Sequence, residues 1–181
     1  MDRKIDIAAN RRASKWSRRE LIGRIIWEIA GRRLFAWSPR PAWGWRRWLL
    51  RCFGARIGQA VRIDPSARIV IPWNLTLGDN VGIGERAILY ALGPITVGKN
   101  ATISQNAHLC AGSHDFRGPD MLLTKPPIAV GAGAWICADA FIGPGVVIGD
   151  FAIVAARAVV VRDVAAGIVE AGNPAVQVGV R

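Results

Sequence analysis

The chain has 181 residues, of which 51% are hydrophobic, and it carries a formal net charge of +11. This length is enough for one domain with a buried core, and the hydrophobic content excludes a disordered chain. Its three cysteines, Cys52, Cys110 and Cys137, show no CxxC spacing, which predicts neither a disulfide framework nor a zinc cage and favours a reducing, cytoplasmic location.

Residues 1–56 form a basic segment that is rich in tryptophan. They contain 15 of the 24 Lys and Arg residues, 4 of the 13 acidic residues and six of the eight tryptophans. The first residues lack the apolar core of a signal peptide, and the apolar run at 21–31 is interrupted by Arg24 and Glu28. The sequence therefore predicts no export signal and no membrane span.

Two short helices are expected in this segment. Ser17 and Glu20 have capping-box spacing at the start of the first helix, and Gly31 can close it. Its expected apolar face consists of Leu21, Ile22, Ile25, Ile26 and Ile29. Pro39 and Pro41 bound a break, after which the second helix is expected. Its expected apolar face consists of Trp45, Trp48, Leu49 and Phe53, flanked by Arg46, Arg47 and Arg51.

A six-residue repeat begins at Ile57. An aliphatic residue recurs at every sixth position, usually followed by a small residue or Asp, and the hexads group in threes over 57–74, 77–94, 97–114, 130–147 and 148–165. Three short strands per 18 residues predict a triangular prism in which each aliphatic residue points inward. The fold class is therefore all-β, a parallel β-helix of about five coils over 57–165, with an N-terminal helical cap, an extruded loop at 115–129 and a C-terminal tail at 166–181.

The basic segment allows three interpretations. Its helices can cap the open first coil, as the ends of solenoids require. Arginine and tryptophan on an amphipathic helix are also typical of attachment to an anionic membrane surface, here the inner face of the plasma membrane. Nucleic-acid binding is permitted by charge, but no recognition motif supports it, and we expect capping together with membrane proximity.

The only two histidines, His108 and His114, each take the last place of a hexad beside an inward residue, so both are expected to point outward. Six residues span one face of the prism, and the two rings therefore cannot share one cleft. The repeat breaks immediately after His114, and loops as long as 115–129 are usually functional. His114 is the candidate general base, whereas His108 is expected to be a face residue near a neighbouring subunit.

Fifteen hexads and five further stretches carry a resemblance to a known family. The stretches are "LFAWSPR" (34–40), "LLRCFGARIG" (49–58), "PWNLTLGD" (72–79), "ISQNAHLCAGSHD" (103–115) and "GNPA" (172–175). The chain resembles the hexapeptide-repeat acyltransferases, and among them the colanic acid biosynthesis acetyltransferases. The resemblance implies a left-handed prism, a homotrimer, acetyl-CoA as acyl donor, and a histidine at the position of His114 that deprotonates the acceptor hydroxyl.

The resemblance also implies where the donor and the acceptor bind. Trp135 matches the family's tryptophan beside the cofactor, and Ala138 and Ala156 match small residues whose backbone the cofactor touches. Basic residues near the C-terminus, Arg162 and Arg181, are expected at the phosphates, although Arg162 can equally be a solvated charge at a corner. Arg157 stands where relatives commonly have glycine. Relatives also carry an acceptor-binding asparagine on the preceding coil, where this chain offers Arg86 and Tyr90 as substrate-binding candidates. Tyr90 can equally pack at a corner.

Three further interpretations concern Asp115, Cys110 and the histidines as metal ligands. Asp115 can orient His114, or it can simply begin the loop turn. Cys110 and His114 could form a nucleophilic pair, but Cys110 occupies a small-residue slot of the repeat and is better explained by packing. Some prisms bind zinc through three histidines, and this chain has two, so no metal is expected.

The expected function is O-acetylation of a sugar or lipid-linked oligosaccharide in surface polysaccharide biosynthesis, with His114 as general base. Two alternatives remain at this point. One is N-acylation of an amino sugar, and the other is a noncatalytic trimeric scaffold for membrane-bound glycosyltransferases.

Overall fold

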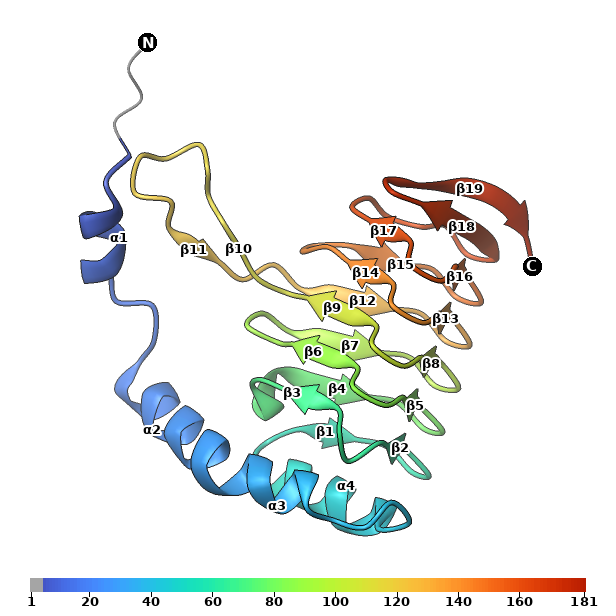
Figure 1. Ribbon diagram of the computed structural model, residues 1–181, viewed down its shortest axis with the longest axis horizontal. Coiled ribbons are helices and arrows are strands. Elements are labelled where there is room, and N and C mark those ends of the chain that lie inside the picture. The colour runs from blue at the N-terminus through green and yellow to red at the C-terminus, as the bar shows by residue number, and fades with distance from the viewer. Residues whose placement is uncertain (1–4) are drawn as a thin grey trace.

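The computed structural model describes residues 5–181 and consists of a β-solenoid preceded by helices (Figure 1). The helical elements are α1 (Ile7–Arg12), α2 (Arg18–Ile26), the π-helical η1 (Trp27–Gly31), α3 (Arg32–Ala36), α4 (Trp43–Cys52) and the 3-10 turn η2 (Pro72–Asn74). In residues 5–181 no helix combines the length and hydropathy needed to cross a membrane.

Three parallel sheets form the faces of the solenoid. The first contains β1 (Arg56–Ile57), β4 (Leu75–Leu77), β7 (Ile95–Val97), β12 (Ile128–Val130) and β15 (Val147–Ile148). The second contains β2 (Arg62–Ile63), β5 (Gly82–Ile83), β8 (Thr102–Ile103), β13 (Trp135–Ile136), β16 (Ile153–Val154), β18 (Ile168–Gly172) and β19 (Ala175–Val180). The third contains β3 (Arg68–Ile69), β6 (Ile88–Tyr90), β9 (His108–Cys110), β14 (Phe141–Ile142) and β17 (Val159–Val160).

The hexad positions stack in register, as the repeat predicts. On the second sheet Ile63, Ile83, Ile103, Ile136 and Val154 pair in consecutive coils, and all five are buried. Burying one aliphatic side chain of this size contributes about 2 kcal/mol, so the stacked aliphatic columns supply most of the driving force for folding. Five complete coils therefore stand where the sequence predicts them.

Residues 166–181 are not the free tail that the sequence predicts. β18 adds a sixth layer by pairing in parallel with β16, and β19 pairs antiparallel with β18. The reason is that the last coil leaves backbone N–H groups open, and the Ala155 N–H donates to the Glu170 carbonyl at 2.8 Å. The hairpin closes that end of the solenoid.

At the N-terminal end of the solenoid, backbone carbonyls rather than N–H groups lack a partner in a neighbouring coil. N–H groups of each coil donate to carbonyls of the following coil, for example Arg62 N to Val81 O at 2.9 Å, so the first coil is left with unpaired carbonyls. Four donors from the helices satisfy these acceptors: Arg51 to Ile57 O at 2.6 Å, Arg47 to Val61 O at 3.0 Å, Arg46 to Ile63 O at 2.7 Å and Trp27 Nε1 to Ile69 O at 2.8 Å. Arginine and tryptophan side chains are pure donors, which suits them to this capping role.

The helices therefore cap the first coil as expected, but with different faces from those predicted. The capping box of Ser17 and Glu20 is present. The predicted apolar face of the first helix is exposed, and Trp27 and Phe35 are buried instead. Gly31 does not end the helix, which continues through η1 into α3.

The second helix shows a similar rotation. Leu49 is buried as predicted, but Trp45 and Trp48 are exposed, while Leu50 takes a core position. Arg46, expected at the flank of the helix, has no exposed surface. Hydrogen bonding to the first coil, rather than apolar periodicity, decides which side of the helix faces the solenoid.

Candidate active site

The chain leaves the solenoid after β9 and forms a hairpin from β10 (Ser113–His114) and β11 (Leu123–Thr124) (Figure 1). The two strands are antiparallel, and His114 pairs with Leu123. His114 therefore lies on an excursion outside the solenoid, rather than at the last place of a prism hexad as predicted. The solenoid resumes at Ile128, two residues before the predicted start of the next repeat block at 130.

A backbone carbonyl orients the His114 imidazole. The ring Nδ1 lies 2.6 Å from the Met121 oxygen, and because a carbonyl can only accept, Nδ1 must carry the proton of this hydrogen bond. In the neutral ring, Nε2 then has a free lone pair, which is the state that a general base requires. The side chain is exposed, so this lone pair is open to a substrate.

Asp115 does not contribute to this arrangement. Its Oδ1 accepts a hydrogen bond from the Arg117 N–H at 3.0 Å, which is the pattern of a turn closed by an aspartate side chain. Of the two roles considered for Asp115, the structure favours the loop turn, and the Met121 carbonyl takes the orienting role.

His108 occupies the third face of the solenoid, between two aromatic rings. Its ring centroid lies 6.2 Å from that of Tyr90 and 5.3 Å from that of Phe141, both in edge-to-face geometry. Burial lowers the pKa of His108, and the positive charge of Arg68 lowers this pKa further. Among the described residues its buried Nε2 has no hydrogen-bond partner. His108 is thus a neutral packing residue of the face, as the sequence suggests.

The two substrate candidates lie at opposite ends of one strand. Tyr90 ends β6 beside Cys110 and lines a cavity of about 420 Å³ between the third sheet and α2. Arg86 lies before β6 at the opposite corner, with a φ of 53°, and its Nε donates to Asn106 at 3.0 Å. One ligand contacting both would have to span the face, so the structure does not bring this pair together.

The predicted cofactor residues gather mainly on the second sheet. Trp135 is 45% exposed on β13, and its Nε1 donates to Ser104 Oγ at 2.8 Å. Ala138 and Ala156 occupy stacked corners next to this strand, where the Arg157 N–H donates to the Ala138 carbonyl at 2.9 Å.

The two basic candidates lie apart from each other. Arg181 reaches the start of the same face, where its Nη1 donates to the Gly133 carbonyl at 2.8 Å, so this guanidinium also fixes the C-terminal hairpin. Arg162 is exposed at a corner that follows β17 on the third sheet. Within one chain it does not reach the Trp135 face.

The two cysteines of the solenoid, Cys110 and Cys137, are half-buried. The Cys110 Sγ lies 3.4 Å from the Gly112 carbonyl, in the half-buried corner slot that the repeat predicts. Burial raises the pKa of Cys137, which disfavours a thiolate. Within residues 5–181, no three His, Cys, Asp or Glu side chains gather as a metal site would require.

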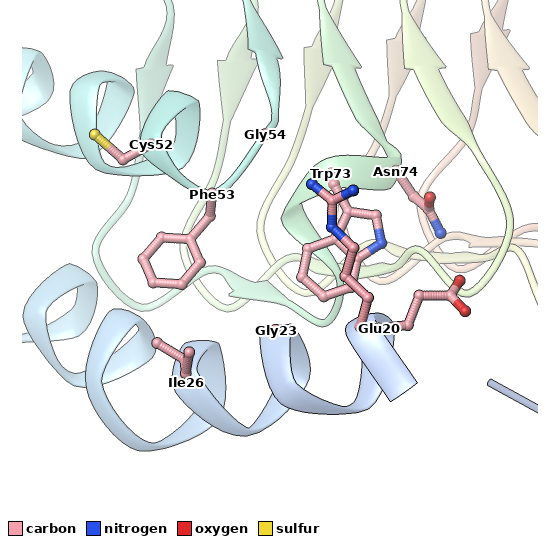
Figure 2. A pocket seen from close by; sticks show the side chains of 9 residues that line it. Glu20, Gly23, Ile26, Cys52, Phe53, Gly54, Trp73 and Asn74 are labelled. Carbon is pink, nitrogen blue, oxygen red and sulfur yellow. The ribbon is translucent and has the colours of Figure 1, made fainter. Parts of the chain in front are cut away.

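A further cavity of about 590 Å³ lies between α2 and η2 and belongs to the cap (Figure 2). Phe53 and Trp73 project toward it, and Gly23 of α2 passes beneath the Trp73 indole. A Cβ at Gly23 would meet that ring at 3.1 Å, so glycine allows this close approach. None of the predicted catalytic or cofactor residues lines this cavity.

Within one chain, His114 and Trp135 are separated. The β10–β11 hairpin projects from one side of the solenoid, whereas β13 lies toward the other side (Figure 1). The imidazole and the face around Trp135, here termed the two candidate half-sites, therefore lie apart within one protomer.

Sequence reasoning missed three residues of these half-sites: Met121, Asn10 and Ser104. Met121 contributes only its carbonyl, which no side-chain pattern reveals. Asn10 donates from α1 to the Asp120 and Met121 carbonyls, 110 residues away, and such a contact has no local signal. Ser104 directly follows β8, but the register pairs Trp135 with Thr102, so the indole reaches Ser104 diagonally and the repeat does not single this residue out.

Comparisons with known proteins agree with this architecture. No family model matches the chain. The chain is 45% identical over 151 residues to the protein of Escherichia coli (strain K12) named "Putative colanic acid biosynthesis acetyltransferase WcaF", a match covering 83% of each chain.

Two solved structures share the fold. The hexapeptide-repeat containing acetyltransferase VCA0836 of Vibrio cholerae, complexed with acetyl coenzyme A, superposes with a TM-score of 0.84 at 23% identity and covers 92% of this chain and 91% of that chain. A galactoside acetyltransferase in complex with coenzyme A gives a TM-score of 0.84 at 22% identity, covering 96% and 88%. The repeat, the stacked coils and the identity to the Escherichia coli relative together show that this chain belongs to the hexapeptide-repeat acetyltransferases.

Proposed function

We propose that the protein transfers the acetyl group of acetyl-CoA to a hydroxyl group of a sugar, with His114 as the general base. The observation that carries this proposal is the 2.6 Å contact from the His114 Nδ1 to the Met121 carbonyl. It leaves Nε2 as the acceptor nitrogen on an exposed ring beside an excursion of the chain. Acetyl-CoA as donor is supported by the complexes of the two structural neighbours with acetyl-CoA and CoA.

The reaction needs a base because a neutral sugar hydroxyl is a poor nucleophile at neutral pH. Nε2 of His114 takes the hydroxyl proton while the oxygen attacks the thioester carbonyl, which gives a tetrahedral oxyanion and an imidazolium. The C–S bond then breaks, and the thiolate of CoA takes the proton back from Nε2. The products are an O-acetyl sugar and free CoA, and the imidazole returns to its starting state.

The complete site requires a second copy of the chain. His114 and Trp135 lie on different sides of one protomer, and Arg162 lies on a third sheet away from Trp135. A homotrimer that sets the hairpin of one chain against the second sheet of its neighbour would join the two half-sites. The donor would then lie between chains, with its acyl end at His114.

The acceptor is proposed as a sugar of a surface polysaccharide or of its lipid-linked precursor. The relationship to the Escherichia coli protein named for colanic acid biosynthesis supports this class. Tyr90 and Arg86 remain the candidates for contacting the acceptor, and the separation of these two side chains implies that each would serve a different part of it.

A membrane-facing surface would suit such a precursor. Ile22, Ile25 and Ile29 form an exposed line on α2 and η1, here termed the α2 stripe, and each is more than half exposed. Exposed Arg18, Arg19 and Arg33 accompany it, whereas Arg46, Arg47 and Arg51 are engaged with the first coil. Apolar residues with arginines beside them match an anionic phospholipid surface, and we propose this as the occupant of the stripe.

The base assignment is tested with His114→Asn, in which the side-chain amide still donates to the Met121 carbonyl but has no basic nitrogen. Release of the free thiol from acetyl-CoA, measured with a panel of sugar acceptors, is expected to fall by about 100-fold or more. His114→Ala serves as the second variant. An unfolding midpoint close to that of the wild type shows that the substitution has not disturbed the solenoid. Turnover that stays unchanged in both variants would contradict the proposal.

A further inference from the structure

The N-terminal helix α1 contacts the loop that carries the orienting carbonyl of His114. Asn10 is the residue of α1 that is buried, with 8% of its surface exposed. Its Nδ2 donates to the Asp120 carbonyl at 2.7 Å and to the Met121 carbonyl at 2.5 Å. The Met121 oxygen therefore receives both the Asn10 amide and the His114 Nδ1, one on each lone pair.

The Asn10 side chain is itself fixed in this orientation. Lys15 Nζ donates to Asn10 Oδ1 at 2.7 Å, so the oxygen end of the amide faces the ammonium and the nitrogen end faces the loop. The Asp6 N–H donates to the Pro119 carbonyl at 2.7 Å, and Lys125 Nζ donates to the Lys15 carbonyl at 2.8 Å. The Lys125 ammonium also lies 3.4 Å from the centre of the Trp16 ring. Residues 6–16 thus contact the loop at 119–121 and again at Lys125.

The loop needs such contacts at Met121. This residue has a φ of 44°, in the left-handed region that side chains other than glycine rarely adopt. A backbone in that region persists only where its surroundings fix it, and here the fixed group is the carbonyl that sets the tautomer of His114. The hairpin strands β10 and β11 are only two residues each, so they give the loop little rigidity of their own.

We infer that Asn10 is a positioning residue for catalysis, which fixes the Met121 carbonyl and through it the tautomer and orientation of the His114 ring. This inference rests on the proposed role of His114 as the base. Asn10 contacts neither the imidazole nor the Trp135 face, so its effect should fall on the chemical step and not on donor binding. The N-terminal segment accordingly has a second role beside capping the first coil.

The test uses Asn10→Asp in the full chain, because aspartate has the same shape but offers only acceptors to the two carbonyls. We expect kcat to fall about tenfold, the loss typical of a broken hydrogen bond at a positioned group, while KM for acetyl-CoA stays within about twofold. Arg11→Ala is the matched control, since Arg11 is exposed on the same helix, and its kcat should equal that of the wild type.

Nitrogen-15 NMR of histidine-labelled protein gives a readout that does not depend on activity. With only two histidines, His114 is assigned by its absence in His114→Ala, and His108 serves as the internal reference. In the wild type the His114 ring should be protonated at Nδ1, and in Asn10→Asp it should become a mixture of the two tautomers with the His108 signals unchanged. Asn10→Ala is expected to show the same pattern, which guards against an effect specific to the new carboxylate.

The outcomes separate this inference from the proposed function. Loss of turnover in His114→Asn, together with wild-type kcat and an unchanged tautomer in both Asn10 variants, would overturn the positioning role alone. A tenfold loss of kcat without any change at the His114 ring would also overturn it, as would a matching loss in Arg11→Ala. Full activity of His114→Asn would instead remove the proposed base and this inference with it.

Discussion

Arg46 shows how one charged side chain can be required inside the cap. It is fully buried, and its guanidinium donates to Ile63 O at 2.7 Å, Ser38 Oγ at 2.7 Å, Pro39 O at 2.9 Å and Arg40 O at 2.5 Å. Burial lowers the pKa of Arg46, and the carboxylate of Asp64 opposes this effect. Five N–H donors in a planar fork are the feature of arginine that no other side chain reproduces.

Replacing Arg46 with methionine should therefore destabilise the protein by about 3 kcal/mol, because several buried acceptors lose their donor at once. Arg46→Lys is expected to recover only part of this loss, since an ammonium cannot reach the four acceptors together. The measurement is the urea-unfolding midpoint at one fixed protein concentration, which keeps any effect of assembly constant.

Arg40→Met is the control for this prediction. Its side chain is 80% exposed and makes only a 3.8 Å ion pair with Asp64, so the change in stability should stay within about 0.5 kcal/mol. Equal unfolding midpoints for the Arg46 and Arg40 variants would mean that the buried hydrogen bonds make no net contribution to stability. Arg46 would then not stabilise the cap.

At the scale of elements, the coils could be predicted and the cap could not. Each hexad places its aliphatic residue inward through local strand geometry, and so the period alone defines the column from Ile63 to Val154. The helix α2 has an apolar face of the usual spacing, yet α2 and η1 dock through Gly23 and Trp27 because the first coil offers carbonyls and a close indole ring. Periodicity cannot reveal a partner surface that is made of backbone acceptors.

The same limit applies to the excursion and to the C-terminal strands. The break in the repeat correctly predicts a departure from the solenoid, but the chain departs after β9 and therefore before His114, not after it. The antiparallel pairing of His114 with Leu123 and its contact with the Met121 carbonyl depend on how the loop folds back, which no repeat encodes. Residues 166–181 have lost the hexad period, but the open N–H groups of the last coil still recruit them as strands.

At the scale of the whole molecule, the basic residues of the N-terminal segment fall into two groups. The arginines of α4 donate to the first coil, whereas Arg18, Arg19 and Arg33 are exposed near the α2 stripe. We expect the full chain to float with vesicles of anionic phosphatidylglycerol at 150 mM salt, a condition close to physiological, and not with vesicles of neutral phosphatidylcholine. Ile25→Glu should abolish the binding, because a charge in the stripe opposes its insertion.

The same experiment includes a control variant, and it tests whether a second copy of the chain covers the α2 stripe instead of lipid. Arg157→Gln lowers the net charge by one unit, as Ile25→Glu does, at an exposed corner of the second sheet, and flotation should not change. Sedimentation velocity is run on the same samples. If the wild type does not float and Ile25→Glu has a different oligomeric state from the wild type, the stripe contacts a second copy of the chain and the lipid proposal is wrong.

The proposed sharing of one site between chains predicts complementation between two defective variants. His114→Asn lacks the base, and Trp135→Ala lacks the indole beside the donor, so each alone should be weakly active at low acetyl-CoA. In a cyclic trimer assembled at random from equal amounts, about a quarter of the interfaces combine an intact His114 from one chain with an intact Trp135 from its neighbour. Trimers purified through a different tag on each variant should therefore regain activity that neither parent shows. If doubly tagged trimers form and stay as inactive as the parents, each chain must build its site alone. His114 and Trp135 of one chain would then have to come together by movement of the β10–β11 hairpin.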